Sequence, residues 1–435
     1  MKERNMPIDK LTISNFKGIA EKTEFEIKPL TLFIGPNSSG KSSCIHALAA
    51  LAQTVKLAST RLPIVLDDEY AQVHLGRFIE VIHSKSYADS IEIGVSLNKS
   101  GVRVKLDKDN DLINENDSIQ AVYSYKSTKR TQDITIEKAE FNIGSKNLTF
   151  RRTSADYSIR LNSKLLSPKA KHQSGLKLSF SPLSTDENKL TVASDKEEVF
   201  DAFILNESIT DLIIGELRKT LYLGPFRQAP LRRYPTRGSS PSEVGAQGEA
   251  AVTLLANESV QSKVRTHINE VSEWISELGL AKKVEVSRVG NSDLFDVQVT
   301  LNDDATLPIA DLGYGMSQIL PVLVQCSFAQ KGSVLLFEQP ELHLHHLAAR
   351  KLATVLAKIA KKKNLRIIAE THSEDLFLQV MSELNNKNIK PDDVIAYEVS
   401  RLEGKSNFNK IIINEEDGKF ECENPWKRGI SGSYA

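Results

Sequence analysis

Apolar positions near the N-terminus follow first a strand pattern and then a helix pattern. Residues 8–15 and 24–34 are strand-like, and residues 30–34 form a mostly apolar run. A loop of Gly, Pro, Asn and Ser follows, and residues 41–56 then carry apolar side chains at helical spacing. An apolar run that breaks at glycine before a periodic segment predicts a buried strand, a tight loop and a helix. We expect this strand–loop–helix unit to organise the rest of the chain.

The pattern changes to short alternating segments between residues 90 and 195. Polar clusters separate these segments at intervals of about 8–12 residues, which predicts an inserted antiparallel sheet. Its basic residues either contact a partner or a phosphate backbone, or keep strand edges soluble. They are Lys126, Lys129, Arg130, Arg151 and Arg152.

Longer segments return after residue 195. The pattern predicts helices over 196–219 and 247–280. It predicts a strand that ends at residue 224 and further strands at 283–288, 294–301, 334–337 and 365–370. A loop after residue 224 carries Arg227, Arg232, Arg233 and Arg237. These arginines either grip phosphates bidentately or bind acidic neighbours, and both alternatives stay open.

Composition narrows the class of protein. The chain has 435 residues, 40% of them apolar, which allows two or three domains with their own cores. No run of about 18 apolar residues is present, and residues 1–16 lack the apolar stretch of a signal peptide. Cys44, Cys326 and Cys422 are far apart, as in a reducing cytoplasm. The zero net charge gives no general attraction to nucleic acid, so any such contact would rest on local patches.

The loop after residue 34 has the full G-x-x-x-x-G-K-[ST] pattern of a phosphate-binding loop. Glycines let the backbone N–H groups converge at the positive end of the following helix, which suits a triphosphate. We expect Lys41 to reach the β- and γ-phosphates of ATP and the Ser42 hydroxyl to bind Mg²⁺. The predicted ATP-binding residues are Gly35, Pro36, Asn37, Ser38, Ser39, Gly40, Lys41, Ser42 and Ser43.

A second acid-bearing strand stands at residues 334–338. Four apolar residues place Glu338 at the carboxyl edge of the sheet, where ligands of open α/β sheets bind. Glu338 is therefore a candidate Mg²⁺ ligand, as in a Walker B strand. The next position normally holds the glutamate that activates water, and it is Gln339 in this chain. An amide is a poor proton acceptor, so we expect slow hydrolysis unless Glu341 acts as the base.

Two further segments complete the expected site. The strand at 365–370 ends before His372, which at that edge is placed to hydrogen-bond the γ-phosphate or the attacking water. Residues 312–318 form a glycine-containing turn before an apolar helix, about 20 residues upstream of the acid-bearing strand. On spacing alone, Gln72 is a candidate for sensing the nucleotide and a weaker candidate for contacting the metal. The alternative is that Gln72 is an ordinary surface glutamine.

The segments GPNSSGKS, LGYGMSQ, LLFEQPELHLH and ETHS together resemble the ABC-type ATPases of the SMC/RecF/OLD class. NFKGI and YLGPFRQAPLRRY make the chain similar to compact prokaryotic AAA ATPases with a DUF3696-like C-terminus, although the tail ENPWKRGISGSYA departs from that pattern. The resemblance implies that Gly313, Gly315, Ser317 and Gln318 contact the γ-phosphate bound by an opposite subunit. It therefore implies a head-to-tail dimer or a higher oligomer.

The fold implied is α/β, a P-loop ABC-type ATPase domain with a mixed sheet, an inserted antiparallel β-rich lobe and a helical segment. Five segments are expected. They are 1–90 with the phosphate loop, 91–200 as the β-rich lobe, 201–300 as a helical and arginine-rich connection, 301–400 with the second half of the site, and 401–435 as a tail.

Such ATPases often act as sensors and scaffolds in antiphage systems, paired with a separate HNH or TOPRIM nuclease. Only 63 residues follow His372, and they lack the carboxylate constellation of two-metal cleavage, so we expect no nuclease on this chain. Two alternatives stay open. One is a RecF-like ATPase that binds DNA directly, and the other is a scaffold that binds ATP without hydrolysing it.

Overall fold

The computed structural model describes residues 7–57, 61–101, 103–107, 110–181, 196–235, 240–413 and 420–421. The chain forms two compact units, each assembled from separate stretches of sequence. The first comprises Met1–Ile27, His46–Thr220 and Glu403–Ser406, and the second comprises Lys28–Ile45, Leu221–Leu402 and Asn407–Ala435. Helix α1 (Ser42–Lys56) begins in the second unit and ends in the first.

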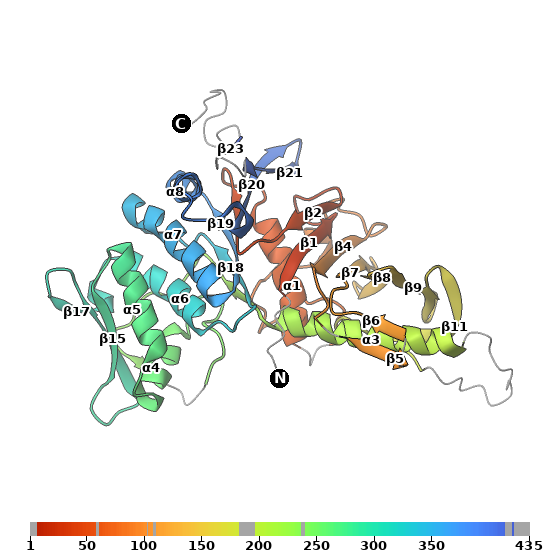
Figure 1. The fold of residues 1–435 in the computed structure, drawn as a ribbon, viewed down its shortest axis with the longest axis horizontal. Coiled ribbons are helices and arrows are strands. Elements are labelled where there is room, and N and C mark those ends of the chain that lie inside the picture. The colour runs from red at the N-terminus through yellow and green to blue at the C-terminus, as the bar shows by residue number, and fades with distance from the viewer. Residues whose placement is uncertain are drawn as a thin grey trace. The chain divides into compact units, whose positions relative to one another are not determined.

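The first unit is built on a nine-stranded antiparallel sheet (Figure 1). Its strands are β1 (Ile8–Ser14), β2 (Thr23–Glu26), β4 (Ile91–Leu97), β7 (Ile119–Ser127), β8 (Ile134–Ile143), β9 (Lys146–Arg152), β10 (Tyr157–Leu161), β11 (Lys164–Ser174) and β12 (Lys177–Ser179). They lie in the order β12-β11-β10-β9-β8-β7-β4-β1-β2. A separate ladder joins β5 (Val104–Asp107) to β6 (Asn110–Ile113), and the unit's other helices are α2 (Phe78–Val81) and α3 (Lys196–Arg218). The expected antiparallel sheet is confirmed, and it also includes β1 and β2.

One face of this sheet is a packed aromatic layer. Tyr123 and Tyr125, two positions apart on β7 and so on the same face, are fully buried, as are Phe141 of β8 and Phe150 of β9. The rings of Tyr123 and Phe141 meet edge to face with centroids 5.8 Å apart. Helix α3 contacts β9, β11 and β12. The period-two alternation of the sequence therefore reflects one buried and one polar face.

The prediction of one strand over residues 24–34 is wrong. The structure has two strands there, β2 in the first unit and β3 (Leu30–Ile34) in the second. Pro29 lacks the N–H that a continuous ladder needs, and the N–H of Lys28 instead donates to the Thr31 hydroxyl at 3.0 Å. The chain consequently leaves one sheet and enters another within a few residues.

The second unit is built on a six-stranded sheet whose central four strands are parallel. Its strands, in spatial order, are β13 (Thr220–Leu223), β18 (Val334–Glu338), β19 (Arg366–Thr371), β3, β20 (Val394–Leu402) and β21 (Lys405–Lys410). All residues of β3 and β18 are buried, because helices α6 (Tyr314–Phe328) and α7 (His346–Lys363) pack against this sheet. Continuous apolar runs in the sequence thus correspond to strands covered on both faces.

The remaining elements of the second unit are helices and a small antiparallel sheet. The helices are α4 (Ala251–Gln261), α5 (Thr266–Leu278) and α8 (Glu374–Asn385), with short turns η1 (Ile309–Asp311) and η2 (Pro391–Asp393). The strands are β14 (Tyr234–Pro235), β15 (Lys283–Arg288), β16 (Leu294–Thr300) and β17 (Thr306–Pro308), and β22 (Ile412–Ile413) pairs with β23 (Phe420–Glu421). Among the described residues, no helix is long and apolar enough to cross a membrane.

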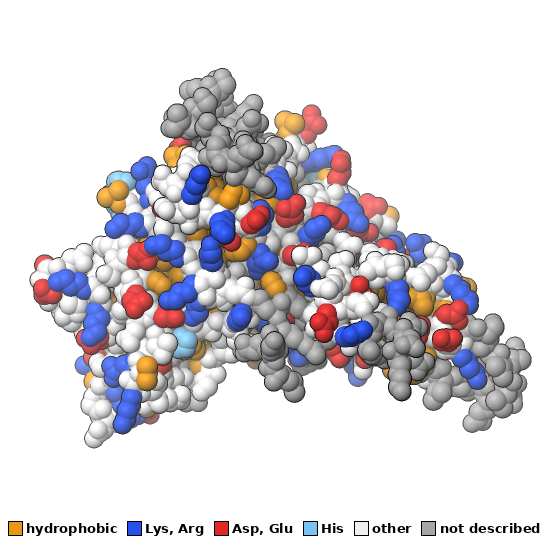
Figure 2. Space-filling model, in the orientation of Figure 1, with side chains coloured by type: hydrophobic (Ala, Val, Ile, Leu, Met, Phe, Trp, Pro, Cys, Tyr) orange, Lys and Arg blue, Asp and Glu red, His pale blue; other side chains and the backbone are white. Residues whose placement is uncertain are grey.

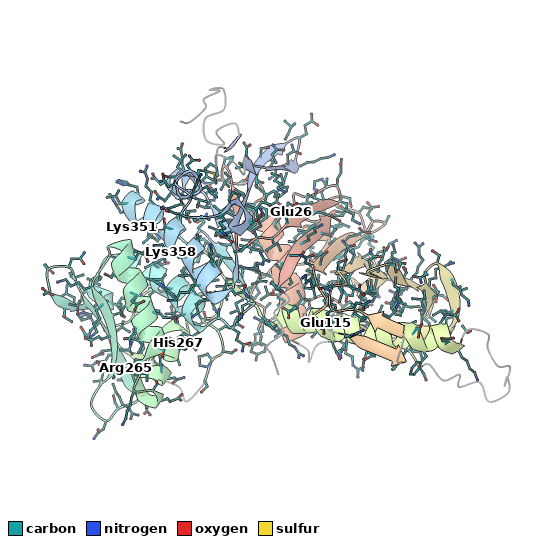
Figure 3. All side chains as sticks on the ribbon, in the orientation of Figure 1. Glu26, Glu115, Arg265, His267, Lys351 and Lys358 are labelled. Atoms are coloured by element: carbon teal, nitrogen blue, oxygen red, sulfur yellow. The ribbon has the colours of Figure 1, made fainter. Side chains whose placement is uncertain are left out.

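Charged residues on these helices are largely paired with one another. Lys358 of α7, labelled in Figure 3, forms an ion pair with Glu277 of α5. Lys363 of α7 pairs with Glu270 of α5 at 2.8 Å. Basic and acidic side chains are interspersed over the face drawn in Figure 2. Lys358 and Lys363 therefore fasten α7 to α5.

Candidate nucleotide-binding site

The phosphate loop lies between β3 and α1, as the sequence predicts. Gly35 and Gly40 have φ angles of 147° and 101°, which strongly favour glycine. A Cβ at Gly35 would also lie 2.2 Å from the carbonyl oxygen of Val399. Pro36, Asn37 and Ser38 are exposed at the tip of the loop, whereas Ser39 and Ser43 are buried. The loop therefore presents its tip and the first turn of α1 to a ligand.

Lys41 is buried within this loop. Its Nζ donates to the carbonyl oxygens of Gly35 at 3.0 Å and Pro36 at 2.7 Å, and lies 3.2 Å from Nδ1 of His372. Burial lowers the pKa of Lys41 to about 8, against the opposing influence of Glu370 and Glu341. Burial and the Lys41 charge lower the pKa of His372. The structure thus brings Lys41 and His372 together, as the two motifs predict.

A pair of carboxylates lies beside the loop. Glu338 at the end of β18 is in register with Glu370 on the neighbouring parallel strand β19, and both are buried. The Ser42 hydroxyl donates to the Glu370 carboxylate, whose pKa is raised to about 7 by burial and then by the charge of Glu338. Glu370 is not among the residues expected from the sequence. The signal was present, because Glu370, like Glu338, is an acid near the carboxyl end of a buried parallel strand.

These oxygens suit Mg²⁺. Oε2 of Glu370 is buried without a hydrogen-bond partner, and carboxylates with a serine hydroxyl are the hard donors that Mg²⁺ prefers. Within the described residues, no three His, Cys, Asp or Glu side chains gather closely enough to hold a metal by themselves. A site with one or two carboxylates is normal for Mg²⁺ that takes its other ligands from phosphates and water. Ser42, Glu338 and Glu370 would hold the ion.

Two residues of the segment YLGPFRQAPLRRY support Glu338. The hydroxyl of Tyr222 donates to Oε1 of Glu338 at 2.6 Å, and burial raises the pKa of Tyr222. Arg227 is also buried, and its Nη2 donates to the carbonyl oxygens of Glu338 at 2.9 Å and Gln339 at 3.0 Å. Arg227 therefore binds backbone, which is neither of the two roles expected for the arginines of this loop.

The other arginines bind acidic neighbours. Arg232 forms a two-pronged ion pair with Asp311, at 2.6 and 3.1 Å. Arg233 lies 4.0 Å from Asp296. Arg237 lies outside the described residues. For Arg232 and Arg233, the structure thus favours the alternative of acidic neighbours over that of phosphate binding.

Gln339 and Glu341 follow Glu338 on a tightly bonded turn. Gln339 has a left-handed φ of 47°, and its N–H donates to the carbonyl oxygen of Glu370 at 3.0 Å. Oε1 of Glu341 accepts hydrogen bonds from the Thr371 hydroxyl at 2.6 Å and from the His372 N–H at 3.3 Å. Its Oε2 is buried without a partner, and burial raises the pKa of Glu341. Glu341 is thus a fixed carboxylate with one oxygen still able to accept a proton.

The glycine-containing turn expected to face an opposite subunit lies at the start of α6. We call residues 312–315 the signature turn. Gly313 precedes the helix, and Tyr314 beside it is 64% exposed. Ser317 and Gln318 are buried, and the Ser317 hydroxyl donates to the carbonyl oxygen of Tyr314 at 2.9 Å. The surface available to another subunit is therefore the turn at Gly313 and Tyr314. Contact of these residues with a second nucleotide stays a prediction.

Gln72 belongs to the first unit, whereas the residues above belong to the second. Its backbone N–H donates to Oε1 of Gln53 at 3.1 Å, and the same oxygen accepts from the N–H of Val73 at 3.0 Å. The segment that carries Gln72 is thus fastened to α1 by a buried glutamine. Its role at the nucleotide stays a prediction.

A family model and one curated relative match most of this chain. A family model described as AAA ATPase domain (AAA_15) matches residues 6–377. The OLD nuclease of Thermus scotoductus (strain ATCC 700910 / SA-01) is 22% identical over 432 residues, which cover 94% of this chain and 65% of that protein. The chain thus spans less than two thirds of the length of this curated relative.

Two solved structures are also similar. The SMC head domain from Thermotoga maritima has a TM-score of 0.42 and 11% identity, over 94% of this chain and 100% of that one. The Smc head domain with an extended coiled coil, bound to the C-terminal domain of ScpA derived from Pyrococcus furiosus, has a TM-score of 0.45 and 12% identity. It covers 93% of this chain and 96% of that one.

Proposed function

Because the chain belongs to the AAA ATPase domain family, we propose that it binds ATP with Mg²⁺ and hydrolyses it slowly as an ABC-type ATPase. One observation carries this proposal. Lys41, just before α1, and Ser42, its first residue, lie beside the in-register acids Glu338 and Glu370 at the carboxyl edge of one parallel sheet. This is where open α/β sheets bind phosphates.

Each residue has a distinct part in this proposal. Lys41 exchanges its bonds to loop carbonyl oxygens for bonds to the β- and γ-phosphates. Bound Mg²⁺ would neutralise phosphate charge at Ser42 and the two acids. Gln339 orients water but does not take its proton, so Glu341 acts as the general base through Oε2. His372 lies beside Lys41 and bonds the γ-phosphate.

We further propose that two subunits assemble head to tail, with Gly313 and Tyr314 of one subunit facing the nucleotide of the other. The exposure of Tyr314 and the open space around Gly313, where a Cβ would meet no atom within 4 Å, support this assembly. A C2 dimer of this kind closes two identical sites at once.

In this proposal the ATP-bound dimer is a sensor and scaffold for a separate HNH or TOPRIM nuclease in antiphage defence. The motif resemblance supports it, as does the similarity to an OLD nuclease of which about a third has no counterpart in these 435 residues. Slow turnover suits a sensor, because the assembled state then persists.

Lys41→Ala tests the enzymatic part. The variant should lose ATP binding in calorimetry and phosphate release at steady state, since the phosphates lose their buried cation. Phage challenge tests the cellular part, using cells that carry the gene with its native neighbours. Equal plating efficiency for the parent, Lys41→Ala and an empty vector would remove the defence role and leave the ATPase assignment standing.

Nucleic-acid binding is the second candidate function, favoured by the charge of strands β7 to β12. Residues 119–181 contain twelve Lys and Arg against four Asp and Glu, an excess of eight positive charges in a chain of zero net charge. Lys138, Arg151, Ser158 and Lys169 are cross-strand neighbours on β8 to β11, and Lys138 is paired with Glu140. The cations Arg151 and Lys169 lie two strands apart, at about 5 Å per strand, and suit neighbouring phosphates of a nucleic-acid backbone.

Duplex binding measured at several salt concentrations tests this candidate. Arg151→Glu with Lys169→Glu should weaken binding and lower the salt slope by about two phosphate contacts. Lys282→Glu with Lys283→Glu is the matched control, because both lysines lie in the other unit and are already paired with acids. Equal loss in both double variants would mean that net charge alone governs binding.

A further inference from the structure

The segment between β13 and β14, residues 224–233, is fastened at both ends, and we call it the arginine loop. At its start the N–H of Gly224 donates to the carbonyl oxygen of Ala246 at 2.8 Å. Near its end the N–H of Leu231 donates to the Tyr234 hydroxyl at 2.9 Å. These bonds fix the positions of both ends of the loop.

The first contact of the arginine loop is with the turn at Gln339. Nη2 of Arg227 donates to the carbonyl oxygens of Glu338 and Gln339, at 2.9 and 3.0 Å. The left-handed φ of Gln339 costs free energy for any residue with a Cβ, so it persists only where surrounding bonds enforce it. The bond from Gln339 N–H to Glu370 acts from the other side of the turn. The N–H of Leu342 also donates to the carbonyl oxygen of Gln339, at 3.1 Å, so Arg227 is one of three groups that bond to the backbone of Gln339.

Arg227 is also in an unfavourable environment for a cation. Its Nε and Nη1 are buried without hydrogen-bond partners, as is Oε2 of Glu341, whose charge attracts the guanidinium. Burial lowers the pKa of Arg227 to about 10. A buried cation with incomplete hydrogen bonding destabilises a fold. Its guanidinium lies between the turn, which it hydrogen-bonds, and the charge of Glu341.

The second contact is with the segment that leads into the signature turn. Arg232 forms its two-pronged ion pair with Asp311, which ends η1 two residues before Gly313. A backbone route runs in parallel, because Tyr234 of β14 pairs with β16 and β16 pairs with β17. Strand β17 ends at Pro308, directly before η1. Both routes connect the arginine loop to Gly313.

We propose that Arg227 and Arg232 are positioning residues, and that the arginine loop couples the turn at Gln339 to the signature turn at Gly313 in the same subunit. The inference rests on the proposed function, in which the first turn serves a subunit's own nucleotide and the second serves its partner's. A shift of the Gln339 turn on ATP binding is then transmitted to the signature turn presented to the other site. The two sites of a dimer thereby respond to each other.

Hydrogen–deuterium exchange without nucleotide tests the coupling directly. Arg232→Ala should speed amide exchange in peptides covering residues 338–342 by about two- to fivefold, the effect of losing one exposed ion pair. Arg77→Ala is the matched control, because Arg77 forms a similarly exposed two-pronged ion pair with Glu80 and lies outside both the arginine loop and strands β14 to β17. Faster exchange confined to residues 309–313, with 338–342 unchanged, would overturn the proposal.

A double-variant cycle on ATP turnover tests whether the two arginines act through one element. Arg227→Gln should lower kcat about 10- to 100-fold and Arg232→Ala about two- to fivefold, with the Kd for ATP unchanged in Arg232→Ala. The double variant should be no slower than Arg227→Gln alone, because the loop is already released from the turn. Multiplied losses would show independent action and reject the coupling. Thermal melting confirms that each variant folds.

The two experiments separate this inference from the proposed function. If the parent neither binds nor hydrolyses ATP, the proposed function fails, while exchange in Arg232→Ala still decides the coupling. If the parent hydrolyses ATP but residues 338–342 do not respond to Arg232→Ala, only the coupling fails. A response equal to that of Arg77→Ala also rejects it.

Discussion

Replacing Glu370 by Gln is expected to stabilise the metal-free protein at pH 8 and to weaken its response to Mg²⁺. The Glu370 carboxyl is 3% exposed and lies beside Glu338 on the neighbouring strand. Burial, followed by the charge of Glu338, raises its pKa from the ordinary 4.5 to about 7. Gln has nearly the same shape and never ionises, so the variant removes the charge and little else.

The sign of the change in stability follows from the direction in which the pKa of Glu370 is shifted. A carboxyl whose pKa is higher in the folded than in the unfolded chain favours folding while it is protonated. Its contribution is fully present below pH 4.5 and is lost as the pH rises to about 7. Each pKa unit corresponds to about 1.4 kcal/mol, so the loss above pH 7 is about 3 kcal/mol. Most of this change in the free energy of unfolding should fall between pH 5 and pH 8.

Denaturant unfolding at pH 5 and pH 8 measures this difference. Relative to the parent, Glu370→Gln should gain about 2 to 3 kcal/mol between the two pH values. Glu69→Gln is the control for the Glu-to-Gln change itself, because Glu69 is exposed. Mg²⁺ should raise the melting temperature of the parent at pH 8 more than that of Glu370→Gln. A stability difference between parent and Glu370→Gln that is the same at both pH values would refute the reasoning.

Three further predictions concern catalysis, assembly and binding. Gln339→Glu should raise steady-state phosphate release at least about tenfold and Glu341→Gln should lower it, since a general base contributes about 10²–10⁴-fold. Fast parent hydrolysis unaffected by either change would place the base elsewhere. Gly313→Arg should leave ATP binding intact and block ATP-dependent dimers in light scattering. Gly315→Arg is a poorer probe, because its Cβ would lie 2.8 Å from the carbonyl oxygen of His343 in the same chain. Because burial lowers the pKa of Lys41 to about 8, ATP binding above that pH must restore a proton, so calorimetry should show Kd rising up to about tenfold per pH unit. Constant affinity from pH 7 to 9.5 would contradict this.

The local sequence determined the parts of the site whose contacts are short-range. The strand, phosphate loop and helix were predictable because glycine conformations and helix starts depend on neighbouring residues. The bonds from Lys41 to Gly35 and Pro36, for example, join residues at most six positions apart. Glu338 was predictable because a buried parallel strand must end at an edge, and ligands of open α/β sheets bind at that edge. The change to alternating polarity after residue 90 likewise predicted the antiparallel sheet.

Tertiary structure alone decided which distant residues complete the site. Glu370 becomes half of an acid pair only because β18 and β19 are neighbours in register, and strand order is not written in either strand. The bonds from Tyr222 and Arg227 to Glu338 span 116 and 111 residues, with no periodicity linking their ends. Burial then sets the chemistry, since the same side chains in water would keep their ordinary pKa values. Periodicity reports how a segment packs, whereas partners and desolvation depend on what the rest of the chain brings beside it.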